Sequence, residues 1–261
     1  MTEQVFDDSD NTVLVSSQQT LPFDEKILSR KTIVYETLVD PAVVKIAAEN
    51  LKNQLFAKYG FLRPAANEIN VTSIEKFYQP YLIINGKYSI DYYRKRIWNI
   101  PVENNVAEIV FPFTRLEANT STDASGKAVR AVTLQGEERV KKEIEASLVL
   151  NEAGIDTSLK DLPSAPSEKN PEETLTKTNT KQVPPDLELS ILRTRIFKRP
   201  TDVSWIANET FQVSERLVIY APRFRATFKH TKTGKERVAE FDGVTGKLLQ
   251  TSDSRITNSA I

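Results

Sequence analysis

The chain contains no cysteine and only one histidine, His230, among its 261 residues. Without cysteine there is no disulfide, no thiolate metal ligand and no cysteine nucleophile. One imidazole cannot make a histidine-rich metal site, because such sites need several nitrogen ligands. We therefore expect no metal and no cofactor. The lack of cysteine also fits a reducing compartment, and we predict a cytoplasmic protein.

Long hydrophobic runs are missing as well. The longest, such as residues 81–84 and 217–221, fall far short of the roughly 20 residues that cross a bilayer. Residues 1–11 are acidic and carry neither the basic region nor the apolar core of a secretory signal. The sequence therefore predicts no membrane span.

Excess charge and familiar catalytic motifs are absent too. The 35 basic and 35 acidic residues cancel, so net charge favours neither nucleic acid nor an anionic membrane as partner.

The chain has no P-loop, no G-x-G-x-x-G and no G-x-S-x-G. We expect no catalytic residues. A hydrolase with a pair of acidic catalytic residues stays open as an alternative, because carboxylates are plentiful.

Two stretches of the chain, residues 71–109 and 211–249, share a pattern, and internal repeats decide architecture. Their matching positions lie 142 residues apart: Val71 with Val213, Tyr78 with Tyr220, and Pro80 with Pro222. Proline removes a ladder donor, so each marks a strand end, bulge or edge. The pattern predicts an α+β protein of two repeated units, each a helix packed on an antiparallel β-sheet, joined by a Pro-rich linker.

The predicted organisation follows from composition. The linker has five prolines and no aromatic residue, so it buries too little apolar area to offset its ordering entropy. The predicted segments are a flexible N-terminal arm (1–30), the first α+β unit (31–116), a loop and accessory helix (117–155), a disordered linker (156–185), the second unit (186–250) and a tail (251–261).

The first unit has clear local signals. Asp40-Pro41 predicts an N-cap followed by a helix, whose apolar face includes Val44, Ala48 and Leu55. Asn85-Gly86 predicts a tight hairpin, because both central residues of a type I′ turn need positive φ. It separates two of the strands expected at 31–35, 69–73, 76–85, 88–98 and 107–111. Asn104-Asn105 predicts a second turn.

Residues 117–127 are rich in Ser, Thr, Asp and Gly and predict a loop. Residues 137–153 predict a helix, because Val140, Ile144 and Leu148 recur every fourth residue and Gly154 follows as a stop.

The second unit is predicted to open on a helix after Asp186 and to continue as strands at 209–214, 216–220, 223–230, 237–241 and 247–250. Turns are expected at Thr233-Gly234 and Thr245-Gly246. We expect Asp242, which precedes Gly243, to serve a turn rather than to bind a metal. We expect His230 to be an exposed residue of a turn.

One strand of this unit has a basic face. Arg223, Arg225 and Lys229 alternate with apolar residues, and alternate side chains on a strand point to opposite faces. The face is a candidate binding site for phosphates, carboxylates or an acidic partner. The competing interpretation is an ordinary solvated face of an antiparallel sheet.

In the first unit the matching strand, residues 81–85, is apolar on both faces. Tyr81 and Ile83 therefore need a covering layer. The helix at 137–153, the second unit or another chain could supply it, which makes these residues a candidate association surface.

Tyr92, Arg94 and Arg96 lie in a stretch where aromatic residues alternate with cations. Single-stranded nucleic acid is bound by such stacking platforms. Aromatic residues also fill strands for packing alone, and no RNA-binding motif accompanies them.

Residues 241–248 read Phe-Asp-Gly-Val-Thr-Gly-Lys-Leu, which resembles the strand–turn–strand ending of PepSY-type domains. Their helix-on-sheet layout is similar to the one predicted here. The resemblance implies a binding or inhibitory module without a catalytic set of its own.

Together these signals predict a non-enzymatic protein–protein interaction module, an accessory or scaffold subunit of a larger assembly. A protein partner or self-association is expected. The alternatives are nucleic-acid or polyanion binding through the basic face of the second unit, and the acidic hydrolase.

Overall fold

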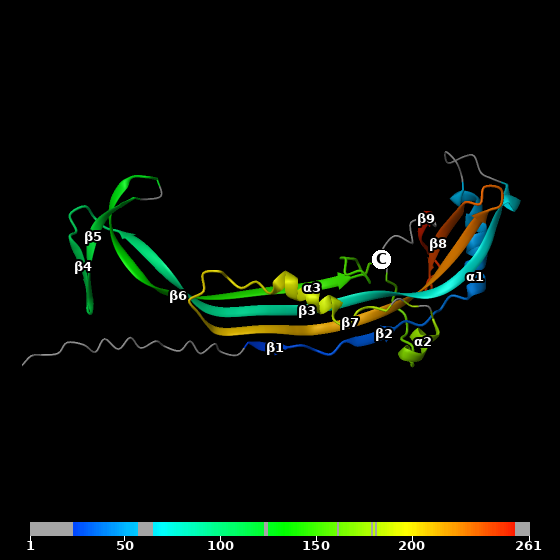
Figure 1. Ribbon diagram of the computed structural model, residues 1–261, viewed down its shortest axis with the longest axis horizontal. Helices are drawn as coiled ribbons and strands as arrows, with labels where there is room; N and C mark the ends of the chain where they lie inside the picture. The colour runs from blue at the N-terminus through cyan, green and yellow to red at the C-terminus, as the bar shows by residue number, and fades with distance from the viewer. Residues whose placement is uncertain are drawn as a thin grey trace, which may run out of the picture. The chain divides into compact units, whose positions relative to one another are not determined.

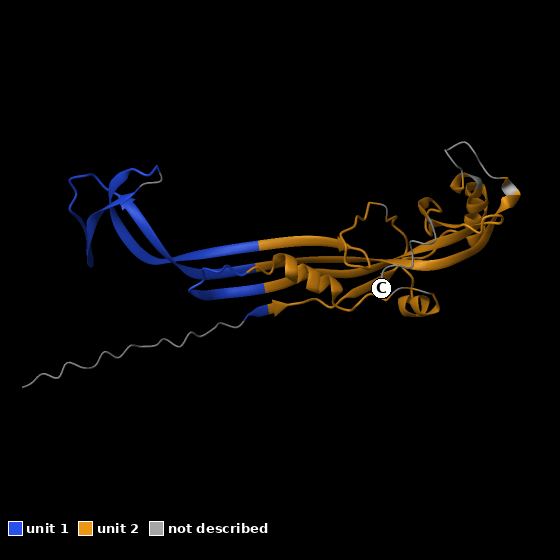
Figure 2. Cartoon of the chain, turned by 45° about the horizontal axis from the view of Figure 1, so that its top comes forward, with its two compact units in different colours: residues 1–24, 89–143, 199–210 blue, residues 25–88, 144–198, 211–261 orange. Residues whose placement is uncertain are grey.

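A computed structural model describes residues 23–56, 65–122, 125–160, 162–178, 180 and 182–253 (Figure 1). The protein is mostly antiparallel β-sheet, with 54% strand and 15% helix. Two compact units divide the chain. Unit 1 comprises residues 1–24, 89–143 and 199–210, and unit 2 comprises residues 25–88, 144–198 and 211–261 (Figure 2).

The strands follow the order β4-β5-β6-β3-β7-β8-β9, with β1 and β2 paired to β7. Their bounds are β1 Asp24–Lys26, β2 Lys31–Val34, β3 Ile69–Pro101, β4 Glu108–Phe111, β5 Thr114–Thr122, β6 Ala128–Leu150, β7 Trp205–His230, β8 Glu236–Asp242 and β9 Leu248–Asp253. The helices are α1 Pro41–Leu55, α2 Pro171–Lys177 and α3 Leu187–Ile196, with a 3-10 turn at Ala66–Glu68. No helix among the described residues is long and apolar enough to cross a membrane.

The predicted fold class is wrong: one large sheet replaces the two repeated helix-on-sheet units. Residues 71–109 form most of a single strand, β3, followed by the start of β4. Residues 211–249 instead turn back twice, as β7, β8 and β9. The two stretches therefore have unlike topologies, and their shared pattern does not mark a structural duplication.

The predicted hairpin at Asn85-Gly86 is also wrong, because β3 continues through it. Every second side chain from Tyr78 to Tyr92 is buried, so the period of two is unbroken at this point. Gly86 serves close packing and not a turn. A Cβ on it would lie 2.6 Å from Cδ2 of Leu192 in α3 and 2.9 Å from the carbonyl oxygen of Gln212.

The predicted helix at 137–153 lies mostly within the strand β6. Spacing of four residues is a multiple of two, so Val140, Ile144 and Leu148 share one face of a strand as well as of a helix. In β6 these three are buried or half-buried, and the odd-numbered residues 141, 143, 145 and 147 are exposed. The predicted loop at 117–127 likewise contains the end of β5.

Helix α1 begins as predicted. The Asp40 carboxylate accepts a hydrogen bond from the Ala42 amide at 2.7 Å, and Pro41 opens the helix. Val44, Ala48 and Leu55 form its buried face. That face packs on Phe224, Ala226 and Phe228 of β7 and on Ala239 and Phe241 of β8. The helix assigned to the first repeat therefore covers strands assigned to the second.

Within the segment 156–185, predicted as a disordered linker, the described residues include α2, and residues 166–168 lie beside the end of β2. The Glu36 amide donates to the Pro166 carbonyl at 2.8 Å, and the Glu168 amide donates to the Val34 carbonyl at 2.7 Å. Tyr35 and Ser167 form an isolated antiparallel bridge. Prolines are compatible with this path because few of its amides enter a ladder.

Smaller predictions have clear outcomes. The turns at Asn104-Asn105, Thr233-Gly234 and Thr245-Gly246 are confirmed, the last two with positive φ at Gly234 and Gly246. Of the predicted N-terminal arm (1–30), residues 1–22 lie outside the described range, and residues 23–30 contain β1. In the predicted tail, residues 251–253 end β9 and residues 254–261 lie outside the described range.

Candidate functional site

Pro222 on β7 and Pro80 on β3 lie near one another in unit 2, since the residues that follow them are joined by a hydrogen bond. On β7, pairing with β2 ends at Tyr220 and pairing with β8 begins at Arg223, so Pro222 lies where the strand changes partner. On β3, the side chain of Gln79, next to Pro80, donates to Glu152, two residues beyond the end of β6. Proline is tolerated in β7 because one ladder stops there before the next begins.

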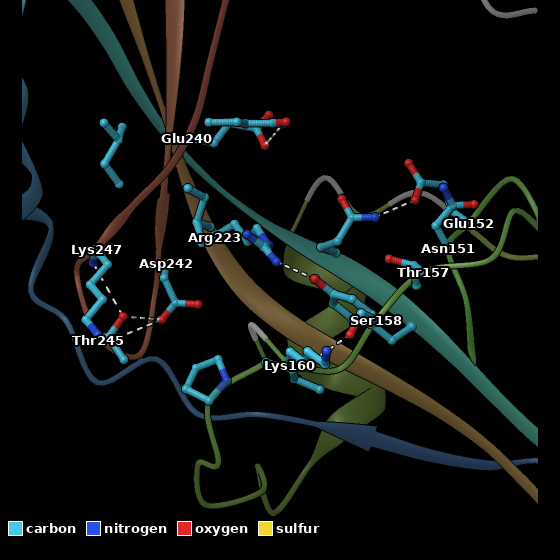
Figure 3. Close-up of a pocket in the computed structure, with 17 residues that line it drawn as sticks. Asn151, Glu152, Thr157, Ser158, Lys160, Arg223, Glu240, Asp242, Thr245 and Lys247 are labelled. Carbon is cyan, nitrogen blue, oxygen red and sulfur yellow. Dashed lines mark hydrogen bonds between the residues drawn. The ribbon is translucent and has the colours of Figure 1, made fainter. Parts of the chain in front are cut away.

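A pocket of about 770 Å³ opens at this interruption (Figure 3). Strands β3, β7, β8 and β9, the β8–β9 turn and the loop after β6 form its wall. The polar residues that line it are Gln79, Tyr81, Asn151, Glu152, Thr157, Ser158, Lys160, Arg223, Glu240, Asp242, Thr245, Lys247 and Gln250. Polar residues that converge in a cleft are typical of a ligand site.

Arg223 lies in the wall of this pocket. The residue is only 8% exposed, and its Nη2 atom donates a hydrogen bond to the hydroxyl of Tyr81. The guanidinium carbon also lies 5.9 Å from the centroid of the Tyr81 ring. Figure 3 shows the arginine with Glu240 and Asp242 on one side and Thr157 and Ser158 on the other.

The carboxylates of the pocket are engaged within the protein. Oδ1 of Asp242 accepts from the amides of Val244 and Thr245, at 3.0 and 2.7 Å, and from the Thr245 hydroxyl at 3.0 Å. The prediction that Asp242 serves a turn is therefore confirmed. Glu240 accepts from Arg225 at 2.7 Å and from Gln250 at 2.7 Å.

The predicted basic face is not an isolated positive surface. In the β7–β8 register Arg223 faces Asp242, Arg225 faces Glu240 and Lys229 faces Glu236. Arg225 is ion-paired with Glu240, and Lys229 lies 3.6 Å from Glu236. Directly opposed unlike charges stabilise a sheet and neutralise its face. The sequence showed the cations but not which strand would lie beside them.

Tyr81 and Ile83 are covered from within unit 2. Tyr81 belongs to a cluster with Ile219 and Ala221, and Ile83 packs against this cluster. Leu159 and Leu162 pack on the same cluster. The covering layer is thus the segment that follows β6, and the structure does not leave this pair as an exposed association surface.

Tyr92, Arg94 and Arg96 lie in unit 1 and have three different environments. Tyr92 is fully buried, and Arg96 is exposed. Arg94 is ion-paired with Glu138 and with Asp202, the latter at 2.8 Å. Neighbouring Tyr93 stacks on Trp205, with ring centroids 4.0 Å apart. These aromatic rings contribute to packing in unit 1.

Three ion pairs in unit 1 shift pKa values: Arg139 with Asp91, and Arg94 with Asp202 and Glu138. Hydrogen bonds from Arg139, 2.7 and 2.8 Å long, lower the pKa of Asp91. A hydrogen bond from Arg94 lowers the pKa of Asp202, and hydrogen bonds to Asp202 and Glu138 raise the pKa of Arg94. Hydrogen bonds that favour the charged form cause shifts of these signs. Asp91, Asp202 and Arg94 stay charged at neutral pH.

Sequence reasoning missed a buried ion pair in unit 2. Glu188 of α3 is fully buried, and its Oε1 atom lies 2.8 Å from Nε of Arg216 in β7. Arg216 also contacts Asp186 at 2.7 Å. Burial opposes its charge, but the hydrogen bonds to Asp186 and Glu188 prevail and raise its pKa. The missed signal was the spacing of Glu188, Leu192 and Ile196, which places the glutamate on the apolar face.

Sequence reasoning also missed an exposed apolar hairpin, formed by β4, residues 112–113 and β5 in unit 1. Phe113 is 100% exposed, Val110 58% and Phe111 43%. The signal was present as a Phe-Pro-Phe sequence at the predicted end of a strand.

His230 is more enclosed than predicted. Its side chain is 14% exposed, lies 3.8 Å from Glu68 and contacts the Phe56 ring edge-on. A hydrogen bond from Lys232 lowers the pKa of Glu68. Across the described parts of the chain, no three histidine or acidic side chains are grouped so that they could hold a metal ion.

These features define a mostly antiparallel β-sheet protein with a polar pocket at the place where β7 changes its partner strand. Comparison with protein-family models, with curated proteins and with solved structures finds no match to the chain.

Proposed function

We propose that this is a non-enzymatic interaction protein, an accessory or scaffold subunit that docks another protein through the apolar hairpin of unit 1. The observation that carries the proposal is the complete exposure of Phe113 at the turn between β4 and β5. A phenylalanine left in water forgoes about 2 kcal/mol of burial free energy, which a partner can recover.

The surroundings of Phe113 support a docking role. Val110 and Phe111 precede it on β4 and are also exposed. Val110 and Phe111 lie on opposite faces of the strand, so the hairpin offers an apolar side chain on each face. Exposed apolar groups gathered on one element favour an interaction site, and aromatic anchors supply much of the binding energy at interfaces. Isolated apolar residues would need no such explanation.

The edge of β4 indicates the kind of partner. β4 ends the strand order, and within the described residues β5 is its only strand neighbour. Its one charged residue, Glu108, lies 3.4 Å from Arg115 on β5. Exposed sheet edges are usually protected by charge or proline inside the strand. An extended strand of a partner protein, apolar on the face that meets Phe111 and Phe113, fits this edge by β-augmentation.

A photo-crosslinking amino acid at position 113 tests the proposal in cells of the native source. We expect one discrete adduct with another protein, identified by mass spectrometry, that disappears when Val110→Asp is added. The control is the same crosslinker at position 43, an exposed valine of α1 in unit 2. Equal labelling from both positions would refute the proposal. An adduct between two copies of this chain would make the hairpin a self-association surface and overturn the accessory role.

A further inference from the structure

The guanidinium of Arg223 is largely buried but makes no direct ion pair with a carboxylate of the described residues. Its Nε atom has no hydrogen-bond partner within the described part of the chain. Asp242 faces Arg223 in the register, but its Oδ1 atom accepts from the amides of the β8–β9 turn. Tyr81 provides a neutral oxygen and an aromatic ring, and no negative charge.

A buried charge without a partner is unfavourable. Desolvation of an ion in a protein costs several kcal/mol, and an opposite charge normally compensates it. Such groups are concentrated at functional sites, where the ligand supplies the missing charge. Here the uncompensated group lies in the wall of a polar pocket.

The acidic side chains of the pocket already have hydrogen-bond partners within the protein, and Arg223 does not use its Nε donor. The partners are Arg225 and Gln250 for Glu240, the turn amides for Asp242, and Gln79 for Glu152. Lys160 and Lys247 are exposed and line the pocket with Arg223. The lining thus carries three acidic and three basic side chains, but internal partners already hold the acidic ones.

We propose that this pocket binds a small organic anion, with its carboxylate or phosphate group on Arg223. A guanidinium matches the oxygen geometry of either group. Lys160 and Lys247 lie at the exposed side of the pocket and attract the anion. Thr157, Ser158 and Gln250 offer hydrogen bonds to the rest of the ligand, and a pocket of about 770 Å³ accommodates a metabolite-sized molecule.

The test uses the full chain with two probes, succinate and inorganic phosphate, at constant ionic strength set by chloride. The readouts are the ¹⁵N–¹H signal of the Arg223 Nε group and the thermal midpoint. We expect at least one probe to shift the Arg223 signal saturably at millimolar concentration and to raise the midpoint. Response to succinate alone identifies a carboxylate ligand, and response to phosphate alone a phosphorylated one.

The matched variants are Arg223→Met and Lys229→Gln, on the same strand. Arg223→Met should abolish the anion response and leave the ligand-free protein as stable or more stable, because it removes an unpaired buried charge. Lys229→Gln should bind normally, because Lys229 already faces Glu236. If Arg223→Met does not fold, Lys160→Gln with Lys247→Gln tests the pocket instead. That pair should weaken binding roughly tenfold at low salt.

Absence of a saturable response to either probe would overturn the proposal. So would an equal response in Arg223→Met, or one that chloride alone reproduces. The docking hairpin contains none of the pocket residues, so failure of either proposal leaves the other standing.

Discussion

Tyr81 and Arg223, 142 residues apart in the chain, are joined by a hydrogen bond between β3 and β7. They are the residues that follow Pro80 and Pro222. The two Tyr-x-Pro motifs therefore meet at one place in a single sheet. There both strands lose ladder donors, other strands begin or end, and a polar pocket opens. The two motifs are similar because neighbouring strands of one sheet each accommodate a proline at this place.

The packing of α3 against β3 depends on Gly86. Gly86→Ala should lower the free energy of unfolding by roughly 1–3 kcal/mol, because the new Cβ overlaps Leu192 and the Gln212 carbonyl oxygen. In a Leu192→Ala background the loss should be smaller, because the side-chain overlap is gone. Urea denaturation of the four proteins measures the coupling. An equal loss in both backgrounds is what a turn glycine would give, and it would contradict the continuous strand.

The buried pair of Glu188 and Arg216 should matter far more than an exposed pair. Glu188→Ala leaves the Arg216 guanidinium without its buried partner and should cost about 3–5 kcal/mol in urea denaturation. Glu173→Ala is the control, because Glu173 pairs with Lys177 on the exposed surface of α2. Its cost should stay below about 0.5 kcal/mol. Similar costs for both would show that Glu188 is solvated.

Acid should weaken unit 1 through Asp91 and Asp202. Both pKa values are lower in the folded protein than in the unfolded chain, so the folded state binds fewer protons. The ion pairs contribute stability above about pH 4, and that contribution is lost as the pH falls through the folded pKa values. Carboxyl ¹³C titration by NMR measures both groups.

Arg139→Gln should return the pKa of Asp91 toward its ordinary value without changing that of Asp202. Arg96→Gln is the control, because Arg96 is exposed and two residues from Arg94. It should leave both carboxyl groups unchanged. A shift of Asp91 in the Arg96 variant would show that general charge, rather than the hydrogen bonds from Arg139, sets its pKa.

The N-terminus of α1 should depend on the side chain of Asp40. Asp40→Ala removes the acceptor for the Ala42 amide and should cost about 1 kcal/mol, measured by urea denaturation. Asn170→Ala is the matched control: Asn170 occupies the same position before α2 but makes no capping hydrogen bond. An equal effect of the two substitutions would mean that the Asp40 cap contributes nothing specific.

Local signals predicted local structure well. Asp40-Pro41, the apolar face of α1 and the glycine turns follow from interactions over a few residues, and each was identified from the sequence. The alternation along β7 also predicted an apolar face, although not that α1 would cover it.

The pairing of strands that are far apart in the chain could not be predicted from such local signals. Val140, Ile144 and Leu148 satisfy both helical and strand periods, and β6 is fixed by its neighbours in the sheet. Asn85-Gly86 favours a turn locally, yet packing against Leu192 requires the same glycine in a strand. Arg223 was identified as a candidate residue, but its environment depends on Tyr81 and on β8, which lie far from it or follow it in the chain.

The parallel pairing of β2, Lys31–Val34, with residues 217–220 of β7 has a consequence for synthesis on the ribosome. At roughly 5–20 residues per second, the early strands wait on the order of ten seconds or more for their partner to emerge. During that interval β3 exposes apolar side chains on both faces. A nascent chain that stops before Trp205 should therefore bind chaperones or aggregate, and pelleting of such a truncated product measures this. Chain release with the last strands in place should restore solubility.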